Sequence, residues 1–197
     1  MSEFDMPARI KRLRLPPGRR IIAVSDIHGN LPYLKGLLKK IRFDADDILI
    51  IDGDFLEKGP DSLGTLRYIM QLSEAGNVYT VCGNCDGGDL RMMYPEVLRF
   101  KCEDVDVLMK HIGGYPGKYD ASIRKQIYER PPKLFISGHS HILKIMNDKE
   151  LGLLHINPGA AGLQGWQKER TIVRLTIDGD QFKDCEVITL ADPRKNK

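Results

Sequence analysis

The sequence lacks the features that mark secreted and membrane-spanning proteins. It contains only four cysteines in 197 residues, and with so few we expect free thiols rather than a disulfide framework. No apolar run approaches the roughly 20 residues needed to cross a bilayer. The first residues, 1–15, are charged and lack the apolar core of a secretory signal. We therefore predict a cytoplasmic protein with no membrane partner.

A large excess of charge of one sign is also missing, because the formal net charge at pH 7 is only +3. Part of this excess lies in a basic N-terminal arm, residues 1–19, which we interpret as solvated, so no specific nucleic-acid binding is expected. The length is that of one domain. We predict a single domain over residues 20–191 and a C-terminal tail over residues 192–197, and the sequence leaves a homo-oligomer open.

Three short apolar runs in the first half predict buried strands, at residues 21–24, 48–51 and 78–81. Between them, leucine, isoleucine and methionine recur at helical spacing over residues 31–41 and 63–72. The order β-α-β-α-β predicts parallel strands joined by right-handed crossovers. The first half therefore indicates an α/β protein.

The second half is rich in short β segments separated by turn residues. Residues 97–102 and 105–110 predict a hairpin, and a helix is expected near residues 120–129. Further strands are predicted at residues 134–137, 142–146, 153–156, 171–177 and 182–190.

Polar side chains that can bind metals stand where these apolar runs stop. Because the carboxyl ends of strands in an open α/β sheet meet in one crevice, groups about 30 residues apart in sequence can converge there. Four of the five histidines lie at such positions, and we interpret the fifth, His155, as structural. A lone residue of this kind is usually a cap, a turn or a hydrogen-bonded side chain, but the ordered series predicts a metal site built by Asp26, His28, Asp54, Asn84, His111, His139 and His141.

The mixture of carboxylate, amide oxygen and imidazole suits borderline divalent ions such as Mn, Fe, Zn, Co or Ni. The sequence offers no convincing Ser-His-Asp or Cys-His arrangement for a side-chain nucleophile. A glycine-rich loop over residues 111–119 follows one predicted ligand. Its Tyr115 and Lys118 could stack on a substrate or contact a phosphate, although a turn whose tyrosines simply pack is slightly favoured.

The series DIHG at 26–29, GD at 53–54, GN at 83–84, His111, and GHSH at 138–141 resembles the five-motif signature of the calcineurin-like metallophosphoesterase superfamily. Segments 83–86, 137–141 and 156–159 are similar to those of YfcE-type phosphodiesterases. The resemblance implies a four-layer fold, a central β-sandwich flanked by helices. It also implies a cytoplasmic hydrolase with two divalent metal ions, Mn being expected first, acting on a small phosphodiester or nucleotide substrate.

By the same resemblance, one ion is held by Asp26, His28 and His141, and the second by Asn84, His111 and His139. Asp54 is expected to bridge them. Two ions about 3.5–4 Å apart can share a hydroxide that attacks the phosphoryl group. The catalytic residues expected on this basis are Asp54, Asn84 and Asp86, the last as an acid or ligand-orienting group, with a simple turn role as its alternative.

Two departures from the family pattern affect the functional prediction. Many members carry His directly after the motif Asn, but here Cys85 and Asp86 follow; a thiol is a poor acid at neutral pH, so we expect modest rates and a preference for good leaving groups. Residues 53–64 resemble instead the branch of Ser/Thr phosphatases and dinucleoside polyphosphate hydrolases, with Lys58 where that branch usually has Arg. A chimera, natural or engineered, is therefore one interpretation.

The leading hypothesis is hydrolysis of phosphodiesters. The alternative enzyme is a phosphomonoesterase or nucleotide polyphosphatase, as segment 58–63 suggests. The alternative outside catalysis is a metal-binding scaffold similar to the retromer subunit that shares this fold. The predicted ligand residues are all present, so metal binding is expected of both the enzymes and the scaffold. A measurement of substrate turnover is therefore needed to distinguish them.

Overall fold

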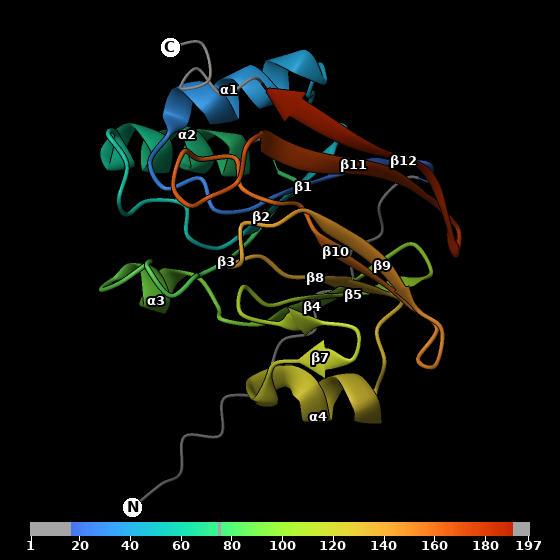
Figure 1. Ribbon diagram of the computed structural model, residues 1–197. Helices are drawn as coiled ribbons and strands as arrows, with labels where there is room; N and C mark the ends of the chain where they lie inside the picture. The colour runs from blue at the N-terminus through green and yellow to red at the C-terminus, as the bar shows by residue number, and fades with distance from the viewer. Residues whose placement is uncertain (1–16, 75, 191–197) are drawn as a thin grey trace, which may run out of the picture.

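Two five-stranded sheets face each other in the computed structural model, which describes residues 17–74 and 76–190. Helices cover the outer face of each sheet (Figure 1). The predicted tail over 192–197, and the predicted basic arm except for its last residues, lie outside the described residues. Within the described part of the chain, no helix is long and apolar enough to cross a membrane.

The first sheet has the strand order β12-β11-β1-β2-β3. Its parallel half contains β1 (Arg20–Val24), β2 (Ile48–Asp52) and β3 (Val78–Val81), connected through α1 (Leu31–Lys40) and α2 (Ser62–Glu74). The antiparallel half contains β11 (Arg170–Asp178) and β12 (Gln181–Leu190). The apolar runs of β1 and β2 are buried because both faces of the sheet are covered. The predicted β-α-β-α-β order is confirmed.

The second sheet has the order β4-β5-β8-β10-β9. Its strands are β4 (Leu98–Cys102), β5 (Val105–Met109), β8 (Leu134–Ile136), β9 (Lys144–Asp148) and β10 (Leu153–Asn157). β4 and β5 form the predicted hairpin, and β5, β8 and β10 run parallel. The expected helix is α4 (Ala121–Glu129), whose first turn is capped by the Asp120 carboxylate accepting from the Ser122 N–H at 2.9 Å.

Three apolar clusters define four layers. The central cluster joins the facing sides of both sheets, with Ile21 and Ile50 from the first and Val107 and Ile136 from the second. A second cluster lies between the first sheet and α1 and α2, and a third lies between the second sheet and α4. The predicted four-layer α/β sandwich is thereby confirmed.

The structure differs from the predicted elements at three places. A one-turn helix, α3 (Leu90–Met93), follows β3, and a two-stranded ribbon, β6 (Gly114–Tyr115) with β7 (Lys118–Tyr119), replaces the predicted turn. The strand predicted over residues 142–146 begins two residues later, at Lys144. Ile142 lies outside the sheet, and its side chain is exposed.

Candidate metal centre

The structure brings the seven predicted ligand residues to one end of the sandwich. Asp26 and His28 follow β1, Asp54 follows β2, and Asn84 follows β3. From the second sheet, His111 follows β5, while His139 and His141 follow β8. Parallel strands of both sheets therefore deliver polar side chains to the same crevice, as the topology predicts.

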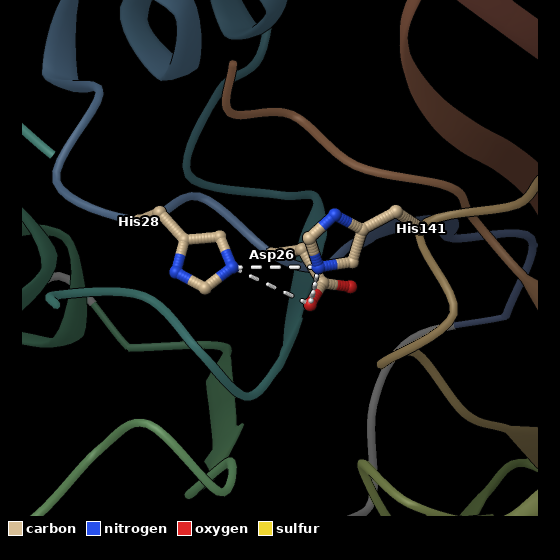
Figure 2. A group of neighbouring side chains, drawn as sticks. All are labelled: Asp26, His28 and His141. Atoms are coloured by element: carbon tan, nitrogen blue, oxygen red, sulfur yellow. Dashed lines mark hydrogen bonds and ion pairs between the residues drawn. The ribbon is translucent and has the colours of Figure 1, made fainter. Parts of the chain in front are cut away.

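The first cluster contains Asp26, His28 and His141, whose nearest donor atoms lie within 4.8 Å of one another. Figure 2 shows both imidazole rings turned toward the Asp26 carboxylate. Asp26 Oδ1 lies 3.0 Å from His141 Nε2 and 3.9 Å from His28 Nε2, and the two Nε2 atoms are 3.4 Å apart. This is the set of side chains expected to hold one ion.

The second cluster contains Asp54, His111 and His139. Asn84 adjoins it, because its Oδ1 lies 2.8 Å from His139 Nδ1. Asp54 Oδ2 is 3.3 Å from His111 Nε2 and 3.9 Å from His28 Nε2 of the first cluster. Asp54 therefore lies between the two clusters, which is consistent with the bridging role predicted for it from the sequence.

Backbone carbonyls orient three of the four histidines. His28 Nδ1 lies 2.9 Å from Glu57 O, His111 Nδ1 2.6 Å from Asp52 O, and His141 Nδ1 2.9 Å from Gln164 O. A carbonyl can only accept, so each Nδ1 carries a proton, and in the neutral ring each Nε2 then presents its lone pair to the crevice. Sequence reasoning missed these partners because a backbone carbonyl carries no residue signature.

The turns that carry the ligands are conformationally costly. Asp26, His28, Asp54, His139 and His141 all have positive φ, between 49° and 65°. Such backbone strain in non-glycine residues persists where the surrounding structure fixes it, and it concentrates at functional sites.

Electrostatics favour a positive charge at His111, whereas burial lowers the pKa of His28 and of His139. Burial lowers the pKa of His111, but the neighbouring carboxylates of Asp54 and Asp26 outweigh it and raise the pKa to about 9. Burial raises the pKa of Asp52 to about 8. Burial on its own would raise the pKa of Asp54. The interactions with His111 and with the Cys85 N–H outweigh burial, so the pKa of Asp54 is lowered. Buried carboxylates thus draw protons, or another cation, to this site.

The residues present fit divalent metal ions. Asp26 Oδ1 and His111 Nε2 are buried and have no hydrogen-bond partner, although buried polar atoms are nearly always paired. Both atoms lie in the two clusters, 3.7 Å apart. Carboxylate oxygen and imidazole nitrogen are ligands of borderline divalent ions, so bound ions would satisfy these atoms.

Asp86 has a different environment from the one predicted for a catalytic acid. It is fully buried. Its Oδ1 accepts from the N–H groups of Phe55 and Leu56, at 3.1 and 3.3 Å, and its Oδ2 accepts from Gly83 N–H at 2.9 Å. These contacts correspond to the structural alternative, in which Asp86 holds together the loops that carry Asp54 and Asn84.

Cys85 lies beside the second cluster, with its N–H donating to Asp54 Oδ1 at 2.8 Å. Burial raises the pKa of its thiol, which is therefore neutral near pH 7. The Lys58 ammonium lies next to this thiol.

The glycine-rich loop over residues 111–119 contains Tyr115 and Lys118, the two possible substrate contacts. It lines a second cleft next to His139. Lys144 Nζ lies 3.4 Å from the centre of the Tyr115 ring, a cation–π contact. His155 is buried, as expected for a structural residue, and its Nε2 lies 3.0 Å from Ser137 Oγ. The Asn157 amide donates to Gly138 O at 2.8 Å and so supports the turn before His139.

Comparison with known proteins agrees with this geometry. A family model described as the calcineurin-like phosphoesterase superfamily domain matches residues 20–180. The chain belongs to this superfamily. Members of the calcineurin-like phosphoesterase superfamily are hydrolases of phosphate esters, and the resemblance seen in the sequence motifs is confirmed.

One curated relative is the symmetrical bis(5'-nucleosyl)-tetraphosphatase of Wigglesworthia glossinidia brevipalpis, 39% identical over 82 residues. The match covers 41% of this chain and only 29% of that relative. Among solved structures, the phosphoesterase Yfce from E. coli has a TM-score of 0.56 at 19% identity, covering 87% of this chain and 98% of that one. Vacuolar Protein Sorting 29 from Cryptosporidium parvum has a TM-score of 0.62 at 15% identity, covering 90% and 100%. These two likenesses concern the fold.

Proposed function

We propose that this protein is a dinuclear metal-dependent phosphodiesterase. The observation that carries the proposal is the pair of donor clusters with Asp54 between them. When bound, two divalent ions, Mn being expected first, neutralise phosphoryl charge and supply a water of lowered pKa. The chain's own contribution is to fix the donors: Nδ1 protonation aims the imidazoles of His28, His111 and His141 into the crevice.

Substrate access and leaving-group preference follow from the open side of the site. Asn84 and His139 are the exposed members of the set, so an ester approaches past them. Cys85 adjoins Asn84, whose Nδ2 lies 3.4 Å from Cys85 Sγ, and Lys58 lies next to Cys85. A neutral thiol donates a proton poorly at neutral pH, while the lysine ammonium can pair with a phosphoryl oxygen. Esters whose leaving groups need no protonation, such as aryl phosphates, are therefore expected to react fastest.

The decisive experiment is hydrolysis of bis-p-nitrophenyl phosphate by metal-stripped protein reconstituted with Mn, with p-nitrophenyl phosphate in parallel and bound metal counted. We expect about two ions per chain, faster cleavage of the diester, and loss of at least about a hundredfold in kcat/KM for Asp54→Asn. The matched control is Asp46→Asn, because the Asp46 side chain is 93% exposed. Equal, metal-independent rates in the wild type and Asp54→Asn would refute the proposal.

A nucleotide polyphosphatase is the second candidate. A cleft of about 270 Å³ adjoins Asn84 and His111. It is lined by Arg91 and Lys110 together with Glu96 and Asp120, and Arg91 pairs with Glu96 at 2.6 Å, which leaves Lys110 as the cation available to a ligand. A cation beside a phosphoryl site suits a second phosphate group. A curated relative is named as a nucleosyl tetraphosphatase. Faster cleavage of a dinucleoside tetraphosphate than of the diester would favour this candidate, and two bound ions without any turnover would favour the scaffold.

A further inference from the structure

Trp166 is the single tryptophan of the chain, and its side chain is completely exposed, at 101% of the reference area. It lies in the loop between β10 and β11, next to the metal centre. Tryptophan is the largest side chain and is usually buried over most of its surface. An indole ring held wholly in water next to a reactive crevice indicates a surface that a ligand covers.

The loop that carries Trp166 is fastened to the metal centre. Gln164 O accepts from the His141 ring at 2.9 Å, and the Gln164 amide donates to Lys58 O at 2.6 Å. Gly162 N–H donates to Asp26 O at 2.9 Å. Gly165 has φ +93°, and a Cβ there would lie 2.4 Å from His141 Nδ1, so this loop touches the His141 ring directly. The backbone that carries the indole is therefore fixed next to the first donor cluster, while the fully exposed ring is free to reorient onto a ligand.

A cleft of about 410 Å³ separates Trp166 from the metal ligands and is lined by His139, Ser140, His141, Ile142, Gly165, Trp166 and Gln167. Ile142 is 61% exposed, so a second apolar side chain is available beside the indole. The lining contains no Lys, Arg, Asp or Glu. One end of the cleft is formed by the donor-cluster histidines His139 and His141, and the other end, around Trp166 and Ile142, suits an uncharged, largely apolar group; the volume is that of a small-ligand site.

We propose that Trp166 and Ile142 form a nucleobase subsite. The inference rests on the proposed function, because a phosphate at the metal centre places the rest of its ester in the adjoining clefts. A nucleobase is flat, uncharged and suited to stacking on an indole, and such stacking tolerates any base. The substrate class is thereby narrowed to nucleoside phosphate esters.

The single tryptophan provides a direct readout. Titration of the Mn-loaded protein with AMP, with phosphate release followed in the same sample to confirm that the probe stays intact, is expected to quench Trp166 fluorescence as the ring stacks. Ribose 5-phosphate, which has the sugar and phosphate without the base, is expected to leave the emission unchanged. Emission that instead changes with protein concentration in the absence of ligand would show that a second copy of the chain covers the ring, and would overturn the proposal.

Calorimetric titration with AMP measures the contribution of the ring. Base stacking on an aromatic side chain supports about 5- to 150-fold in affinity, so Trp166→Ala should weaken AMP binding by at least about fivefold and Trp166→Phe should retain most of it. Tyr128→Ala, which removes an aromatic ring that is 52% exposed on α4, is the matched control and should bind AMP normally.

The outcomes separate this proposal from the proposed function. If ribose 5-phosphate binds as tightly as AMP, or Trp166→Ala binds AMP as well as the wild type does, the subsite is refuted while the phosphodiesterase proposal stands on its own assay. If neither probe binds in the presence of Mn and bis-p-nitrophenyl phosphate is not cleaved, both proposals fail.

Discussion

Asp86 links the two loops that carry Asp54 and Asn84, and it does so from a fully buried position. In Asp86→Asn, one carboxylate oxygen becomes an NH₂ group that faces a backbone N–H. A buried donor without an acceptor costs about 1–3 kcal/mol, so we expect the free energy of unfolding in urea to fall by that amount and metal affinity to weaken. Asp89→Asn, at an exposed site with no side-chain cap hydrogen bond, is the control. Equal losses in both variants would contradict this role.

His155 gives the fold a defined response to acid. Burial lowers its pKa to about 4, below the ordinary value near 6.5. Ser137 Oγ donates to Gly114 O, so it accepts from His155 Nε2–H, and the ring is neutral with Nδ1 unpaired. The unfolded chain binds this proton below pH 6.5, whereas the folded chain does not until about pH 4.

The stabilisation from His155 is therefore complete above pH 6.5 and is lost as pH falls toward 4. From this residue we expect about 2 kcal/mol less stability at pH 5 than at pH 7.5. Urea unfolding of the wild type and His155→Gln at both values isolates the effect, because the other groups titrate in both proteins. If the two proteins lose stability equally over this interval, the neutral, buried state assigned to His155 is wrong.

At the scale of elements, the strand ends determine how closely the ligands approach. Gly53, between β2 and Asp54, has φ +73°, and a Cβ there would lie 2.6 Å from the His111 ring. In Gly53→Ala we expect about 1–2 kcal/mol of destabilisation from the left-handed backbone, together with displacement of His111 and loss of Mn-dependent turnover. Gly87→Ala is the control, since nothing lies within 4 Å of its added Cβ. Normal metal content and turnover in Gly53→Ala would show that His111 is not held by this contact.

The strands and the convergence of the polar residues that follow them could be predicted, because continuous apolar runs and the polar residues after them are local signals. Other elements left no such signal. α3 is a single turn, too short for a helical period, and the β6–β7 ribbon is indistinguishable from a turn in sequence. Ile142 was assigned to a strand because apolar residues are usually buried, yet it is exposed beside the crevice. Trp166 was missed because one aromatic residue in a loop has no periodicity, and its exposure depends on how the loop folds.

For the whole molecule, the metal centre joins parts of the chain that are distant in sequence. Its donors come from both sheets, and its two clusters combine residues from each, such as His28 with His141 and Asp54 with His111. The folded site favours added positive charge, since neighbouring carboxylates raise the pKa of His111 and burial raises the pKa of Asp52. Ions that bind here therefore stabilise the packing of one sheet against the other, and such binding favours the folded state by mass action.

We therefore expect the thermal stability of the protein to depend strongly on bound metal, whether or not the protein turns over a substrate. At a free Mn concentration 100 times the Kd, each ion adds about 2.7 kcal/mol, which for a chain of this size raises the Tm by roughly 5–10 °C per ion. We expect a shift of this size between EDTA-treated and Mn-loaded protein by differential scanning calorimetry. The shift should shrink in Asp54→Asn, which removes the carboxylate predicted to be shared by the two ions, and persist in Asp46→Asn. An undiminished shift in Asp54→Asn would mean that the ions bind elsewhere, because removing the carboxylate between the two clusters should weaken the binding of any ion held there.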